Sequence, residues 1–236
     1  MKHGLLSAQV SAGCMLFIHR DCTLQLRDDT ADCLLYAQLA ATKKHDRFAA
    51  SVSWSETWVA AMTRFGYVLT HSECVSRSAR ELSTMTVWDW PSGHLPAFFS
   101  HELFSEAGRL ARRALEAAAN QPAFGLLTRQ ALEAVPQVDQ PLLQRQQKVV
   151  VQLAVLGPAS DLSLVTLTYT SRHPLSADFL FEPLPANDVI GNVEMRFYSM
   201  SMMEPVYASL RKPIREALAD KRAGLCYAIE DVDHER

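Results

Sequence analysis

Residues 149–170 read VVVQLAVLGPASDLSLVTLTYT, and this stretch decides the fold. Two runs rich in aliphatic and β-branched residues, 149–156 and 162–170, flank the turn-forming segment 157–161, which contains Gly, Pro, Ser and Asp. Apolar runs of this length separated by a short turn are typical of paired strands. The stretch therefore predicts an antiparallel hairpin.

Further strands are expected on both sides of this hairpin. Residues 193–202 alternate polar with apolar positions and predict a third strand of the sheet, and Phe179–Phe181 predicts a short one between prolines. Two earlier hairpins are also predicted, one within residues 14–27 and one that pairs 67–75 with 84–90.

Several segments carry the helical spacing of apolar residues. The expected helices are 31–45, 53–65 (opened by a Ser53/Glu56 capping box), 95–120, 123–134 and 204–221. Helices and antiparallel strands occur in separate runs, without regular β-α-β alternation. We therefore predict an α+β fold, in which an antiparallel sheet packs against several helices.

The chain has 236 residues, which suits one domain spanning 1–236. The segment 136–147, rich in Gln and with two prolines, is the candidate internal boundary. It would separate a helix-rich N-terminal part from a sheet-rich C-terminal part.

The charge balance argues against nucleic acid as a partner. Lys and Arg number 23 against 26 Asp and Glu, so no basic excess is available to neutralise phosphates. The short basic stretches Lys43-Lys44 and Arg112-Arg113 are interpreted as solvated helix faces. No apolar run is long enough for a membrane-spanning helix, so a membrane role is not expected from this feature.

Cysteine usage and the N-terminus favour the cytoplasm. Five cysteines at irregular spacing do not resemble a disulfide framework or a paired metal site. The apolar run before Cys14 is too short for the core of a secretory signal. We therefore expect reduced thiols and a cytoplasmic protein, with export as the alternative.

Motifs of catalysis and cofactor binding are absent from the sequence. No Gly-rich phosphate loop, nucleophile elbow or paired metal-ligand spacing occurs, so we expect no metal and no cofactor. The catalytic candidates are His71, Cys74, His94 and His101, because they lie near predicted loops or strand ends.

Aromatic residues and methionines suggest a different kind of site. A ligand pocket is expected where the second helix meets the later sheet, with walls that include Trp58, Tyr67, Trp88 and Met200. Core packing is the alternative explanation for these side chains.

These observations lead to three hypotheses about function. The leading one is a soluble, non-catalytic protein that binds a partner protein or an apolar small ligand and forms a homo-oligomer. The second is an enzyme of unrecognised class that uses the histidines and Cys74. The third is a secreted or membrane-active effector or toxin, in which the 149–170 hairpin inserts into a bilayer as part of a barrel.

Overall fold

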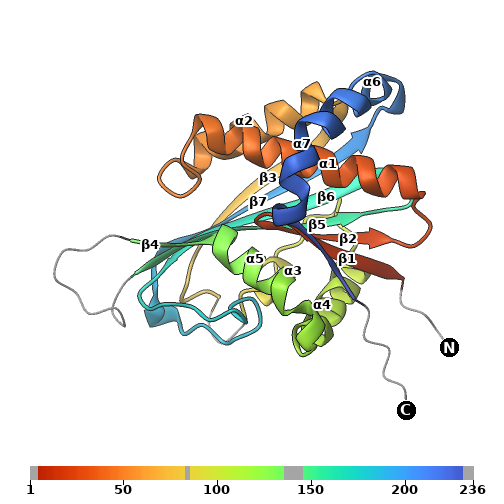
Figure 1. Ribbon diagram of the computed structural model, residues 1–236. Coiled ribbons are helices and arrows are strands. Elements are labelled where there is room, and N and C mark those ends of the chain that lie inside the picture. Colours follow the sequence, from red (N-terminus) through yellow and green to blue (C-terminus); the bar gives the residue numbers. More distant parts are fainter. Residues whose placement is uncertain (1–4, 83–85, 136–145, 231–236) are drawn as a thin grey trace, which may run out of the picture.

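The computed structural model describes residues 5–82, 86–135 and 146–230 (Figure 1). Within these ranges eight strands form one sheet in the order β3-β7-β6-β5-β2-β1-β8, and β4 pairs with β5 off this path. The strands are β1 (Leu6–Ser11), β2 (Cys14–His19), β3 (Tyr67–Ser78), β4 (Leu132–Ala134), β5 (Gln147–Leu156), β6 (Asp161–Ser171), β7 (Val189–Met202) and β8 (Cys226–Ile229). The pairs are antiparallel except β2 with β5.

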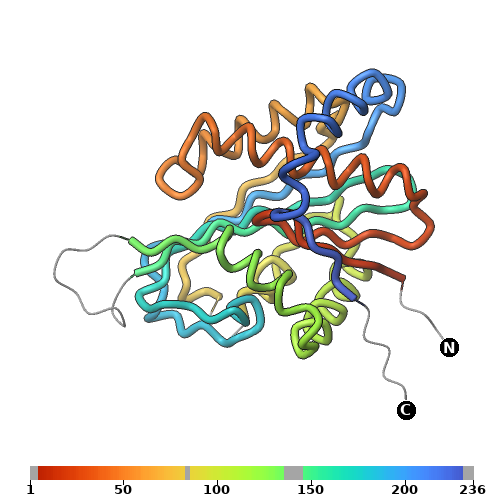
Figure 2. The backbone as a smooth tube through the Cα atoms, in the orientation of Figure 1, coloured from red at the N-terminus to blue at the C-terminus, as the bar shows by residue number. Residues whose placement is uncertain are grey.

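Helices cover both faces of the sheet, so the described part of the chain has three layers (Figures 1 and 2). The first face, here called the α1 face, carries α1 (Leu24–Lys44), α2 (Ser51–Arg64), α6 (Glu204–Ala208) and α7 (Arg211–Leu225). The other, the α4 face, carries α3 (Asp89–Ser92), α4 (His101–Leu115), η1 (Ala118–Asn120) and α5 (Gln121–Ala131). The short helix η3 (Ala186–Asp188) precedes β7. This arrangement confirms the predicted α+β class.

The predicted central hairpin is confirmed as β5 and β6. Its register joins Gln147 to Ser171 at one end and Leu156 to Leu162 at the other. All residues of β5 from Val149 onward are buried, because side chains alternate between two helix-covered faces. Leu153 belongs to the core of the α4 face, and Ala154 belongs to that of the α1 face.

The hairpin predicted within residues 14–27 is wrong. The first run forms β2, but its hairpin partner is the preceding strand β1. The second run begins α1, whose N-cap is Thr23: its hydroxyl oxygen accepts a hydrogen bond from the Leu26 N–H at 3.2 Å. The spacing of Leu24 and Leu26, two residues apart, is that of a strand, but the run is short. The helix cap at Thr23 outweighs this alternating pattern.

The hairpin that would pair 67–75 with 84–90 is also wrong. β3 pairs with β7, and residues 83–85 lie outside the described ranges. Thr86 makes only an isolated bridge to Pro183, and the following residues Asp89–Ser92 form α3. The partner of β3 is the long strand β7, and eleven residues of β3 are paired with residues of β7.

The short strand expected at Phe179–Phe181 is a turn instead. The N–H of Phe181 donates to the carbonyl of Asp178 at 2.8 Å, which closes the chain locally. Phe179 and Leu180 are nevertheless buried in the core of the α4 face. Their apolar character reflects packing, not pairing.

Several helix ends also differ from expectation. The first helix begins at Leu24 and not at residue 31, α4 begins at His101 and not at residue 95, and α5 ends at Ala131, where the expected helix 123–134 gives way to β4. The Ser53/Glu56 capping box does not form, because α2 already begins at Ser51. The expected helix 204–221 is divided into α6 and α7, and Pro213 lies in the first turn of α7, where its missing N–H costs nothing. Most of the candidate boundary 136–147 lies outside the described residues.

Candidate ligand-binding site

The four residues expected to line a pocket do not come together. Trp58, Tyr67 and Met200 are buried in the core of the α1 face. Trp88 lies on the α4 face, where its ring stacks on Phe104 with centroids 5.1 Å apart. The sheet separates Trp88 from the other three, so their shared role in one pocket stays a prediction.

The histidine and cysteine candidates are also dispersed. His71 and Cys74 both lie on β3, three residues apart, so their side chains point to opposite faces of the strand. The His71 ring stacks on Phe98, with centroids 5.1 Å apart. His94 Nδ1 lies 3.0 Å from the Trp90 carbonyl oxygen, and His101 is the first residue of α4. None of the three candidate histidines is therefore seen paired with the Cys74 thiol in the arrangement that nucleophilic catalysis uses.

The described ranges contain no group of three or more His, Cys, Asp or Glu side chains arranged to hold a metal ion. None of their helices combines the length and apolarity needed to cross a membrane.

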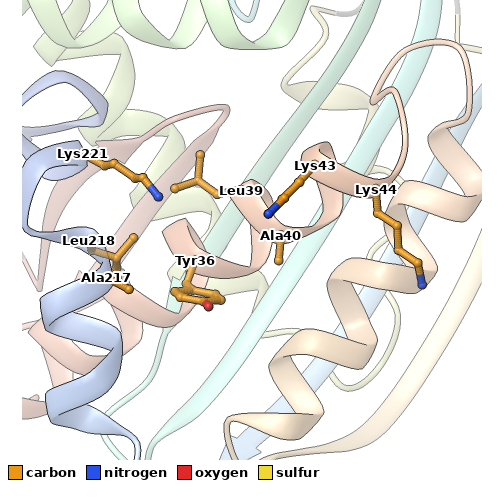
Figure 3. Close-up of a pocket in the computed structure, with 8 residues that line it drawn as sticks. All are labelled: Tyr36, Leu39, Ala40, Lys43, Lys44, Ala217, Leu218 and Lys221. Atoms are coloured by element: carbon orange, nitrogen blue, oxygen red, sulfur yellow. The ribbon is translucent and has the colours of Figure 1, made fainter.

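A hollow of about 500 Å³ lies between α1 and α7 (Figure 3). It is lined on the α1 side by an aromatic, a leucine and an alanine, and on the α7 side by an alanine and a leucine. These residues are Tyr36, Leu39, Ala40, Ala217 and Leu218. The hollow therefore has apolar side chains on both its α1 and its α7 side.

Three lysines complete the lining of this hollow, and no carboxylate does. In Figure 3 the ammonium groups of Lys43 and Lys221 extend from opposite sides toward the gap between the two helices. Lys44 extends instead toward α2. No carboxylate in the described part of the chain lies within 4.0 Å of these three ammonium groups, which are exposed to solvent. The hollow thus combines apolar surface with unpaired positive charge.

A second hollow, of about 630 Å³, lies between α1 and α2 and shares Tyr36, Ala40 and Lys44 with the first. Tyr36 packs edge-on against Phe65, with ring centroids 5.3 Å apart. Glu56 and Arg64 of α2 both line this side. The two hollows together form a groove along the outer surface of α1, and positive charge predominates in its α7 half.

The wall formed by α7 is held by buried carboxylates of α1. The side chains of Asp29 and Asp32 are 1% and 2% exposed. Arg211 and Arg215 bind Asp29, and Arg222 binds Asp32. Pairing of buried carboxylates with arginine forks is the arrangement that compensates their desolvation. The arginines of α7 are thus occupied by α1, whereas Lys221 on the same helix remains available.

Sequence reasoning did not identify this groove. The pair Lys43-Lys44 predicts a solvated helix face, which describes its exposure but not its neighbours. The sequence does offer one signal. Tyr36, Leu39 and Ala40 lie beside those lysines and extend the apolar surface of the helix beyond the face that packs on the sheet. Lys221 has no local signal, because only tertiary packing places it opposite Lys43.

No protein-family model and no curated protein sequence matches the chain. Two solved structures share a coarse likeness. The activated Cyt2Ba monomer from Bacillus thuringiensis subsp. israelensis aligns at a TM-score of 0.41 and 5% identity, covering 82% of this chain and 98% of that one. A delta-endotoxin aligns at a TM-score of 0.42 and 8% identity, covering 86% and 88%. Likenesses this weak carry no argument about what the chain does.

Proposed function

We propose that the protein binds an anionic amphiphile, a small molecule with an apolar body and one acidic head group, in the hollow between α1 and α7. The observation that carries the proposal is the joint lining of this hollow by apolar side chains and by three unpaired lysines. Its volume of about 500 Å³ lies in the range of small-molecule sites.

Each half of such a ligand has a counterpart in the hollow. An alkyl chain or ring removes its apolar surface from water against Tyr36, Leu39 and Leu218. A carboxylate or phosphate lies near Lys43 and Lys221, which face each other across the opening. Because these ammonium groups are solvated, charge contributes modestly to affinity and mostly to selectivity.

The simpler interpretation is that the lysines only stabilise helix α1 and bind no ligand. Lys43 and Lys44 lie in its last turn, where cations offset the partial negative charge of a helix C-terminus. This explanation does not extend to Lys221, which belongs to α7 and still lines the same hollow. The convergence of two helices is therefore what favours a ligand.

The test is a calorimetric titration with a medium-chain fatty acid and with the alcohol of equal chain length. We expect the acid to bind at least about tenfold more tightly than the alcohol. Lys221→Gln and Lys43→Gln should each weaken binding of the acid about three- to tenfold, and should make that binding less dependent on salt concentration. Lys212→Gln is the matched control, because Lys212 lies on α7 beside Glu216 and outside the hollow.

Two results would contradict the proposal. Equal affinity for acid and alcohol would remove the role of charge. An equal loss of affinity in Lys212→Gln and Lys221→Gln would show a nonspecific effect of net charge.

The acidic head group has two sources, a free fatty acid or a lipid within a bilayer. Vesicles of phosphatidylglycerol and of phosphatidylcholine, each loaded with a dye, distinguish them. Binding of the free acid without vesicle binding supports a carrier of soluble ligands. Dye release would favour the membrane-active hypothesis, for which β5 and β6 would have to leave a position buried on both faces.

We also propose that the protein is non-catalytic, acts in the cytoplasm and forms a homo-oligomer. A non-catalytic role is supported by the dispersal of His71, Cys74, His94 and His101. Action in the cytoplasm is supported by the cysteine usage and is tested by cell fractionation. The homo-oligomer requires a surface through which copies of the chain associate.

A further inference from the structure

Strand β3 forms one edge of the sheet and pairs only with β7 among the described strands. It is twelve residues long, and the seven residues Val68–Cys74 are all exposed. The opposite edge, β8, has four residues. An exposed edge of this length presents a row of unpaired backbone donors and acceptors, to which another strand can add.

A bulge limits the part of β3 that can accept a partner. The register against β7 shifts between Leu69 and His71, which disturbs the regular pattern of the strand there. From His71 to Ser78 the register is regular. This segment contains no proline and no lysine, the residues that commonly protect a sheet edge.

We propose that this segment pairs with the same segment of a second copy of the chain, antiparallel and centred on Val75. In a two-fold pairing about Val75, each Glu73 stands directly opposite Arg77 of the other copy, and Val75 faces Val75. The three side chains share one face of the strand, since they are two residues apart. Two opposite-charge pairs then flank an apolar contact, which makes the edge self-complementary.

Neighbouring registers lack this complementarity. A pairing centred on Glu73 sets two carboxylates opposite each other. A pairing centred on Cys74 sets His71 opposite Arg77 and leaves Glu73 opposite Val75. Directly opposed residues of an antiparallel pair point to the same face of the sheet. A pairing centred between two residues would oppose residues that point to different faces, so the pairing must be centred on a residue. Charge therefore selects Val75.

The proposed dimer is independent of ligand binding. β3 is an edge strand, whereas the hollow is formed by α1 and α7, and none of its lining residues belongs to β3. Failure of either proposal leaves the other standing.

Charge reversal with rescue tests the register. Sedimentation equilibrium should show a monomer–dimer equilibrium for the unaltered chain. Glu73→Arg and Arg77→Glu should each weaken the dimer at least about fivefold, and the double exchange should restore it to within about threefold. Glu81→Gln is the control, because Glu81 contacts Arg77 only within the chain, at 3.8 Å.

Cross-linking tests the same register by a different property. Cys74 would stand opposite Ser76 of the second copy, and directly opposed Cα atoms lie about 4.5–5.5 Å apart, within disulfide range. Ser76→Cys should therefore give a covalent dimer on mild oxidation. Ser72→Cys should not, because Ser72 would face Ser78.

Three outcomes would overturn the proposal. One is a chain that stays monomeric up to about 100 µM. Another is a dimer that neither charge reversal weakens. The third is cross-linking of the unaltered chain through Cys74, or of Ser72→Cys as readily as Ser76→Cys, which would show a different register.

Discussion

Asp29 of α1 and Arg211 of α7 are joined by two hydrogen bonds, from Arg211 Nε to Oδ1 at 3.1 Å and to Oδ2 at 2.9 Å. The Asp29 side chain is 1% exposed and that of Arg211 is 20% exposed. The pair therefore holds a buried anion under a partly solvated cation. Because α7 supplies one wall of the hollow, this contact also fixes the spacing of the proposed ligand site.

Asp29→Asn should lower both stability and ligand affinity. The amide retains the shape of the carboxylate but leaves Arg211 and Arg215 without their shared anion. We expect the free energy of unfolding in urea to fall by about 1–3 kcal/mol, since the arginines can recover some hydration. Fatty-acid binding should weaken as α7 loosens.

Glu204→Gln is the control for this prediction. Glu204 also contacts Arg211, but its side chain is 54% exposed, so the loss should stay within about 0.5 kcal/mol. Equal losses in the two variants would mean that burial of Asp29 does not determine the strength of the contact.

Gly13→Ala should destabilise the protein, and Gly224→Ala should not. A methyl group at Gly13 would lie 2.6 Å from Cζ of Arg47, which is only 6% exposed. Arg47 cannot move freely, because its Nη2 donates to the Gly13 carbonyl at 3.2 Å and its guanidinium stacks over Trp54. We expect a loss of about 1–3 kcal/mol in thermal or urea unfolding.

At Gly224 nothing lies within 4 Å of an added methyl group, and the residue is in α7. The same substitution there should raise stability by up to about 1 kcal/mol, because alanine loses less backbone entropy in a helix. Opposite signs at the two glycines are expected, and a loss at both would contradict the role assigned to Arg47.

The predictable part of the fold is the part with local signals. The hairpin of β5 and β6 followed from two apolar runs and a turn, and α2 followed from the helical spacing of Trp54, Trp58 and Met62. The errors fall where pairing is nonlocal. β3 looked like half of a hairpin, but its partner β7 lies more than a hundred residues further along the chain.

The candidate site was less accessible to sequence reasoning than the fold. Large aromatic residues such as Trp58 suggest a ligand pocket, yet their size explains their burial in the core equally well. The residues that line the groove are ordinary surface lysines and small apolar side chains. Their significance arises from the packing of α7 on α1, which depends on pairs such as Arg222 with Asp32. No periodicity in either helix encodes that contact.

The five cysteines should differ sharply in reactivity, with Cys74 alone reacting fast in the folded protein. Cys74 is exposed, whereas Cys14, Cys22 and Cys33 are buried. Burial raises the pKa of Cys14 to about 12, and it also raises the pKa of the half-buried Cys226. Since the thiolate is the reacting form, these thiols stay protonated and slow near neutral pH.

Titration with Ellman's reagent checks this expectation. In the folded chain one thiol equivalent should react rapidly with the reagent. In the chain unfolded in guanidinium all five thiols should react. Cys74→Ser should abolish the rapid phase while leaving four equivalents after unfolding, because only the exposed thiol has been removed. A rapid phase that survives this substitution would place a second reactive thiol at the surface and contradict the full or partial burial of the other four cysteines.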